Sequence, residues 1–535
     1  MAISCCVLAS LAELVALRLS GTSGAVALAP QALALAPIGA WHDDRWILVF
    51  ASSWPAAGLE IGAALCIRAV LMALMVRALW PERPPRWGAA LRRAAVGEAI
   101  LVLAMSPWAT LSFLGGIVSL SWLVFAGIAG AAATAMLLCH VGIAPRFAQR
   151  LPSLRAIAWS AVAFVLSGVE AAVVVAAPGW WQLVPVLAAG VTNAWCWRQL
   201  IVALARPRAL RPRRLEGVLA PLVLILGVPA LLLAGAAGFG THVETAIPHR
   251  VVRSARPRRG QRVVLVVNGF MSDWNGGRPT VSVPGHFSAQ YSYRGQSRRG
   301  RPLAYSSAAT TAPLAVLARR LARQVRRLAR LSGRRVDLLA VSEGTLVVWR
   351  YLTSTARLPV RMAVLTSPLV RPDRDAYPPP GRTGAGMLGE AEARGLLALL
   401  DAEAPKAHLS ANMAMVRSLM NDPALYRRTG LCPLGSVAVR ELVPLAAAAV
   451  SWPGSASGVP TAIIPAVHAG VLRHPGELGV VRSLLSGAPM PSDGAWGPTF
   501  RALSDIFDAW EAPTLPLAQM PATAGAGLLG GARCR

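Results

Sequence analysis

The chain has 535 residues, of which 55% are hydrophobic and only 15% charged, whereas a typical soluble domain is about 25% charged. Its mean hydropathy of +0.50 argues against a purely soluble protein. The formal net charge of +28 by itself indicates an anionic partner. Nearly every cation is arginine, however, with Lys406 the single lysine, which is typical of G+C-rich bacterial genomes. The positions of the arginines are therefore more informative than their number.

The composition changes near residue 242, and the part before it is dominated by long apolar stretches. A bilayer is crossed by about 20 apolar residues. We expect one span within 2–39 and further spans at 59–79, 95–114, 117–139, 156–177, 181–204 and 217–240. The sequence therefore predicts an N-terminal, all-α transmembrane bundle of about six or seven helices in a domain covering 1–242.

Arginines are concentrated in alternate loops between these predicted spans. The intervening loops, around Gly115–Gly116 and Pro178–Trp180, are short and uncharged. Basic loops of membrane proteins face the cytoplasm, so we expect the chain after residue 242 to lie on the extracytoplasmic side of the cell membrane. The basic loops contain Arg77, Arg83, Arg86, Arg92 and Arg93, then Arg146, Arg150 and Arg155, and then Arg206, Arg208, Arg211, Arg213 and Arg214.

Four ionisable residues lie within the apolar stretches, where a charge is costly and often functional. They are Glu60, Arg68, Glu98 and Glu170. Arg68 is expected to pair with a neighbouring helix. For Glu170, the most interior of the four, a role in transport or proton relay and a structural pairing inside the bundle both stay open.

After a basic linker at 243–261, the pattern becomes that of an α/β domain over 262–487, followed by a C-terminal helix and tail at 488–535. Residues 312–331 form an amphipathic helix with arginines on one face, which is either a solvated surface or a contact with anionic lipid headgroups. Strands are expected at Arg262–Phe270, His286–Arg294, Ala363–Pro368, Ser436–Leu445 and Pro460–Pro465, and a further hydrophobic strand is expected to begin at Val336 and to run into the segment that starts at Ala340.

A sharp strand-to-helix turn is predicted at Ala340-Val341-Ser342-Glu343-Gly344. It resembles the nucleophile elbow G-x-S-x-G of the α/β-hydrolase superfamily, with alanine at the first position. Small residues are needed beside the serine because larger side chains would collide in so tight a turn. The resemblance covers about 262–487 and implies a mostly parallel sheet, with Ser342 as the nucleophile and residues 370–435 as a cap.

The resemblance also implies the positions of the base and of the oxyanion hole. The histidine follows the last strand in this superfamily, which points to His468, whereas His474 before Pro475 has the place of a turn residue. The oxyanion-hole donors would be the backbone N–H groups of Phe270, after the Asn268-Gly269 turn, and of Glu343.

No carboxylate stands where the resemblance places the catalytic acid. The predicted strand at Ser436–Leu445 is followed by a run of alanines. Glu441 lies inside this strand, and Asp373 and Asp375, after the Ala363–Pro368 strand, offer an alternative position. A Ser–His pair without an acid and a catalytically decayed domain both stay open.

The arrangement resembles membrane-anchored hydrolases of G+C-rich bacteria, and it implies a serine hydrolase of the esterase or lipase type or an acyltransferase. Its partners would be the lipid bilayer and an ester or acyl substrate, which includes lipids. A receptor or scaffold without activity, and a transporter with an accessory hydrolase-like domain, are the alternatives. Nucleic acid is not expected, because no known binding pattern accompanies the arginines. We expect no cofactor or metal; the seven cysteines form no CxxC pair.

Overall fold

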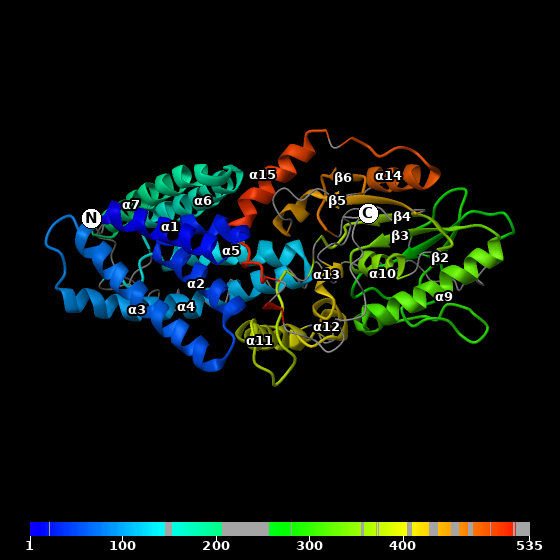
Figure 1. The fold of residues 1–535 in the computed structure, drawn as a ribbon, viewed down its shortest axis with the longest axis horizontal. Coiled ribbons are helices and arrows are strands. Elements are labelled where there is room, and N and C mark those ends of the chain that lie inside the picture. Colours follow the sequence, from blue (N-terminus) through cyan, green and yellow to red (C-terminus); the bar gives the residue numbers. More distant parts are fainter. Residues whose placement is uncertain are drawn as a thin grey trace.

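A helical bundle and a parallel-sheet α/β domain lie end to end along the long axis of the molecule (Figure 1). The computed structural model describes residues 1–20, 22–144, 152–205, 256–279, 281–354, 358–370, 372, 374–403, 409–426, 437–450, 459–468, 475–492, 494–516 and 519–520. The predicted span at 217–240, most of the basic linker, and residues Asp373 and His474 lie outside this part of the chain.

The described part of the bundle contains seven α-helices and two short 3₁₀ helices. Five of these α-helices, α1, α3, α4, α5 and α6, are long and apolar enough to cross a membrane. The predicted span at 181–204 corresponds to α7, which is not among the five. The bounds are α1 Ala2–Leu19, η1 Ser23–Gln31, α2 Ala36–Phe50, α3 Trp54–Leu79, α4 Trp87–Val118, α5 Ser121–Leu138, α6 Leu154–Ala176, η3 Gly179–Gln182 and α7 Leu183–Ala205.

The predicted loop around Gly115–Gly116 was misplaced, because both glycines lie inside α4. The chain turns at Ser119, which has a left-handed conformation with φ +52°. The glycines permit close packing instead. A Cβ on Gly115 would stand 2.5 Å from Cγ2 of Val124, and one on Gly116 would overlap the carboxylate of Asp375.

The α/β domain is built on a parallel sheet of six described strands in the order β2-β1-β3-β4-β5-β6. Successive residues of a strand point to opposite faces, so alternate residues of β1 belong to different hydrophobic clusters. The strands are β1 Val263–Val267, β2 Phe287–Gln290, β3 Val336–Val341, β4 Val360–Thr366, β5 Ala438–Pro444 and β6 Thr461–Ile464.

Helices cover both faces of this sheet. α9 (Leu314–Ser332) and α10 (Glu343–Leu352) bury their apolar residues on one face, and α14 (Pro475–Ser486) covers the other. The predicted fold class, an all-α bundle followed by an α/β-hydrolase-like domain, is confirmed. The remaining elements are η4 Ser307–Thr311, α11 Met387–Glu403, α12 Ala414–Met420, α13 Pro423–Tyr426, η6 Leu445–Val450 and α15 Trp496–Asp508.

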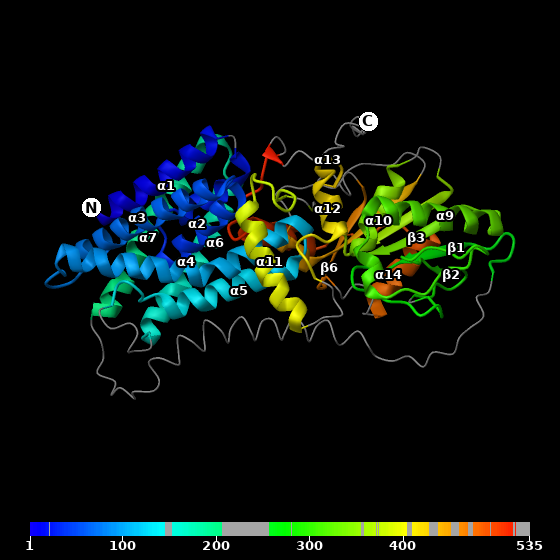
Figure 2. The same ribbon diagram turned by 90° about the horizontal axis from the view of Figure 1, so that it is seen from below.

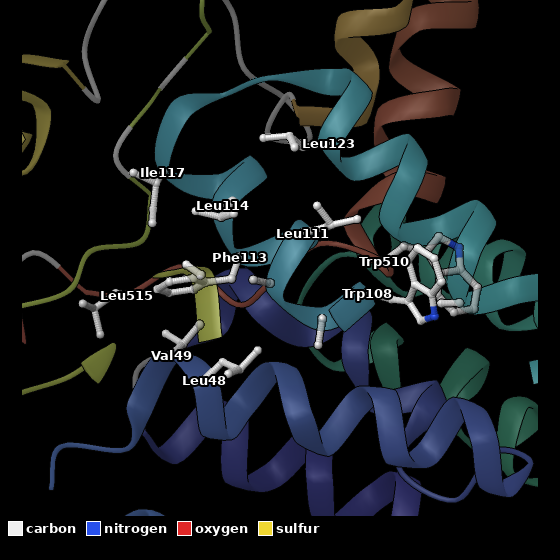
Figure 3. Packing of buried hydrophobic residues seen from close by; sticks show 14 of the residues in the cluster. Leu48, Val49, Trp108, Leu111, Phe113, Leu114, Ile117, Leu123, Trp510 and Leu515 are labelled. Carbon is white, nitrogen blue, oxygen red and sulfur yellow. The ribbon is translucent and has the colours of Figure 1, made fainter. Parts of the chain in front are cut away.

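One continuous hydrophobic cluster contains residues of both the bundle and the sheet domain. The segment after α15 enters the bundle, where Trp510 stacks on Phe164 with ring centroids 3.9 Å apart and on Trp41 at 5.5 Å. Figure 3 shows Trp510 and Leu515 among the packed side chains of α2, α4 and α5. Residues far apart in the sequence therefore fix the sheet domain to the end of the bundle.

The region predicted as a cap contributes to the same junction. α11 lies beside α4, as Figure 2 also shows. A Cβ on Gly389 of α11 would stand 2.6 Å from the ring of Phe113. The carboxylate of Glu392 accepts hydrogen bonds from the hydroxyls of Ser106 at 2.6 Å and Thr110 at 2.7 Å. α11 is therefore bound to the bundle by both apolar and polar contacts.

Candidate active site

Ser342 lies in the tight turn between β3 and α10 with φ +53° and ψ −125°. Such a conformation is strained for a residue with a side chain, and it concentrates at functional positions. The turn is held by hydrogen bonds from the Ser342 N–H to the Thr366 carbonyl at 3.1 Å and from the Thr345 hydroxyl to the Ser342 carbonyl at 2.6 Å. The backbone therefore presents the serine at the carboxyl end of the central strand.

Gly344 is required by the packing of α10 against the end of β1. A Cβ at this position would stand 2.5 Å from the carbonyl oxygen of Val267 and 2.6 Å from that of Asn268. The collision is therefore with the neighbouring strand, and not with the other small residue of the turn as the sequence argument supposed. Ala340 is fully buried in β3, and its carbonyl accepts a hydrogen bond from the Thr366 hydroxyl at 2.9 Å.

The structure brings His468 to Ser342, although 126 residues separate them in the chain. The imidazole Nε2 lies 2.8 Å from Oγ of the serine, within the distance at which a general base accepts a proton. His468 follows β6 and is partly buried. Burial lowers the pKa of its imidazole to about 4, so the ring is neutral at neutral pH and able to accept the serine proton.

The loop after β1 lies against Ser342. A Cβ on Gly269 would stand 2.8 Å from Cβ of Ser342. Within the described part of the chain, the backbone N–H groups of Phe270 and Glu343 donate no hydrogen bond outside a helix or strand. Glu343 begins α10, and the first N–H groups of a helix have no partner within it. Two unused donors therefore belong to the residue that follows Ser342 and to the residue that follows Gly269, the glycine in contact with Ser342.

Two residues that the sequence argument did not single out support this loop. The N–H of Met271, which has φ +59°, donates to the Thr310 hydroxyl at 3.2 Å. Thr310 lies in η4, 39 residues further along the chain, so no local pattern could reveal the contact. The backbone N–H of Met271 is thus occupied, whereas that of Phe270 donates no hydrogen bond within the described residues.

No carboxylate reaches His468 in the described part of the chain, where burial is the only cause of its lowered pKa. Asp375 is buried against Gly116 of α4. Glu441 lies inside β5, and its Oε2 accepts a hydrogen bond from the Thr461 hydroxyl at 3.4 Å. Asp373 is outside the described residues. The structure therefore brings Ser342, His468, Phe270 and Glu343 together, and it leaves Asp375 and Glu441 apart from them.

The side chain of Glu343 is 0% exposed, and neither of its carboxyl oxygens has a hydrogen-bond partner among the described residues. Burial raises the pKa of this carboxyl well above its usual range. Burial therefore favours the protonated, uncharged form of this carboxyl group.

No family model and no curated protein matches the chain. Among solved structures, lipase B of Aspergillus fumigatus is similar with 13% sequence identity and a TM-score of 0.24, over 70% of this chain and 95% of that chain. The hydrolase-like fold is assigned here from the strand order and the elbow. In the described residues, no group of three or more His, Cys, Asp or Glu side chains is placed to hold a metal ion.

Proposed function

We propose that the chain is a membrane-anchored serine hydrolase that acts on an ester or acyl substrate through Ser342 and His468. The observation that carries this proposal is the 2.8 Å contact between Ser342 Oγ and His468 Nε2, in a strained turn with two unused N–H donors beside it. Acyl transfer requires a nucleophile, a neutral imidazole that accepts its proton, and N–H donors that bind the oxyanion.

The reaction would take place in two halves. Ser342 Oγ attacks the carbonyl carbon while its proton passes to His468 Nε2, and the N–H groups of Phe270 and Glu343 bind the oxyanion. The bond to the leaving alcohol then breaks, and Nε2 returns the proton to the alcohol oxygen. Water attacks the acyl-enzyme in the same way and restores Ser342. An alcohol acceptor in place of water would make the same site an acyltransferase.

The position of the site supports a substrate that is drawn from the bilayer. The loop after β4 contacts the end of α4, because the Arg374 N–H donates to the Gly116 carbonyl at 3.1 Å and the Ser119 hydroxyl donates to the carbonyl of Val370. The carboxyl edge of the sheet, where Ser342 lies, is thus at the bundle side. Apolar side chains flank the catalytic residues, with Met271 43% and Val467 59% exposed.

Anchoring and orientation are proposed from α4. This helix begins within the arginine-rich segment 77–93, which covers the end of α3, the α3–α4 loop and the start of α4, and its other end contacts the sheet domain. Since arginine-rich loops stay in the cytoplasm, the sheet domain would lie on the extracytoplasmic side.

A fluorophosphonate probe, which reacts with activated serines, tests the proposal on the full chain in detergent. We expect labelling of the wild type, none of Ser342→Ala, and a large loss in His468→Ala. Ser306→Ala, at an exposed position, is the matched control and should label normally. Absence of labelling in folded wild type would favour the alternative, a receptor whose hydrolase-like domain has lost its activity. The observation that favours this alternative is that no carboxylate lies beside His468 in the described residues.

A further inference from the structure

The strongest charge asymmetry of the chain lies in residues 256–335, which contain seventeen arginines and one acidic residue, Asp273. These residues form β1, β2, α9 and the loops between them. They are outside the predicted spans and their loops, so the positive-inside rule does not account for them.

Four of these arginines form a stripe along α9. Arg319, Arg323, Arg326 and Arg330 recur at intervals of four, three and four residues, which places them on one face of the helix. All four are exposed, and none makes an ion pair within the described part of the chain. We call these four residues the arginine stripe.

A second group of arginines lies directly beside the stripe, in the loop 294–301. The Arg327 guanidinium donates to the carbonyl of Arg299 at 2.9 Å, and Arg320 donates to that of Tyr293. These contacts hold the loop against α9, with Arg298 and Arg299 exposed. The two groups thus form one continuous basic surface.

Like charges three or four residues apart destabilise a helix by about 0.2–0.5 kcal/mol per pair. α9 has several such pairs and no acidic residue to offset them. An external anion that lies along the stripe would remove this repulsion, and guanidinium groups bind phosphate oxygens in a bidentate manner.

The location of α9 argues against a bilayer as the anion. Both views show α9 at the end of the molecule far from the bundle (Figures 1 and 2). Its apolar residues, Leu314, Leu317, Leu321, Val325 and Leu328, are buried in the domain, so it has no free apolar face to insert among lipids.

The surface also lacks what single-stranded nucleic-acid binding uses, which is exposed aromatic rings for base stacking. Among the described residues of 256–335, the one large hydrophobic side chain that is exposed is Met271, which is not aromatic. The ligand that remains is a polymer that carries negative charges at regular intervals along its backbone. We propose that the arginine stripe and the loop 294–301 bind linear polyphosphate, a chain of phosphates that carries no bases, at the end of the molecule away from the membrane. This proposal does not depend on the hydrolase activity.

Binding of fluorescent inorganic polyphosphate to the full chain in neutral-lipid nanodiscs tests this proposal. We expect binding at about 50 mM salt that weakens linearly in log Kd against log salt. The variant R319Q/R323Q/R326Q/R330Q should lose at least tenfold in affinity. Its salt slope should fall by about 3, since each ionic contact to a single-stranded polyanion contributes about 0.7.

The matched control is R83Q/R86Q/R92Q/R93Q, which removes the same charge from the α3–α4 loop and the start of α4, at the other end of the molecule, and should change Kd less than twofold. Thermal unfolding of both variants verifies folding. Three results would overturn the proposal: no binding by the wild type, equal losses in the two variants, or tighter binding of single-stranded DNA with the same number of phosphates, which would assign the surface to nucleic acid.

Discussion

His468 is the residue whose environment most affects the proposed chemistry. Burial keeps it neutral, which favours its action as a base. The imidazolium that forms during attack gains no stabilisation from a carboxylate in the described residues. Loss of that carboxylate costs about 10⁴ in rate in serine proteases. We therefore expect the enzyme to react readily with activated acyl compounds and slowly with ordinary esters.

The pH dependence of labelling should report this environment. Protonation of the imidazole abolishes its action as a base, so the labelling rate should fall as pH decreases through the pKa of His468, which is about 4. A histidine with the ordinary pKa would lose activity near pH 6.5. Fluorophosphonate labelling rates between pH 4 and 8 measure the midpoint. A midpoint at or above 6.5 would show that a carboxylate or solvent reaches the imidazole.

Gly344→Ala should damage the elbow, because its Cβ would meet the carbonyl oxygens of Val267 and Asn268. Overpacking of this kind costs about 1–3 kcal/mol. We expect a lower Tm and at least a tenfold slower fluorophosphonate reaction.

The control for this prediction is Gly479→Ala, in α14, where a Cβ meets nothing within 4 Å. An alanine in a helix interior is favoured over glycine by about 0.5–1 kcal/mol, so this variant should be equally or more stable. Equal stability of the two variants would contradict the packing argument.

At the scale of elements, α4 connects the two parts of the molecule. Its 32 residues span about 48 Å at 1.5 Å per residue, whereas the hydrocarbon core is about 30 Å thick. The helix is therefore longer than one crossing requires, and its last turns pack against the sheet domain, where Phe113 packs on Tyr377 with ring centroids 6.2 Å apart. The uncharged, glycine-containing end of α4 was predicted to be a loop because part of its packing, such as the contacts of Gly116 with Asp375 and of Phe113 with Tyr377, is with residues more than 250 positions away in the sequence.

The segment after α15 is the second connection. Arg45, which is fully buried, donates to the carbonyl oxygens of Ala509 at 2.9 Å and Glu511 at 2.7 Å. Arg374 forms an ion pair with Glu511. From the sequence, this segment was predicted to be part of a tail. Local patterns reveal neither the stacking partners of Trp510 nor the contact with the buried Arg45.

Trp510→Ala should consequently destabilise the junction between the two parts. Truncation of a buried tryptophan costs about 3–5 kcal/mol, and here it also removes the stacking on Trp41 and Phe164. Thermal unfolding in detergent measures the effect. Trp496→Ala, at the exposed start of α15, is the control and should change Tm little. If both variants had the same Tm as the wild type, the segment would not hold the junction.

Across the whole molecule, the elements with strong periodicity could be predicted and the contacts between them could not. Mostly aliphatic runs identified five of the six described strands, the alternating pattern of His286–Arg294 identified β2, and apolar length identified most bundle helices. Ser342 and His468 were found because a sharp turn and a histidine after the last strand have local signatures. Asp375 was a candidate acid because it follows β4, but its place against α4 depends on tertiary packing. Arg68 was expected to pair, and its partner is Asp43 of α2 at 2.6 Å.

The orientation of the molecule in the membrane is the remaining prediction. The exposed loop residue Glu82 lies between α3 and α4, at the arginine-rich end, whereas Ser306 is exposed in the sheet domain. In a background without native cysteines, Ser306→Cys should react with a membrane-impermeant maleimide in intact cells, and Glu82→Cys only after permeabilisation. The two sites control for each other, since each should label fully once the membrane is opened. The reverse pattern would place the sheet domain in the cytoplasm, and the substrate would then be drawn from the inner leaflet.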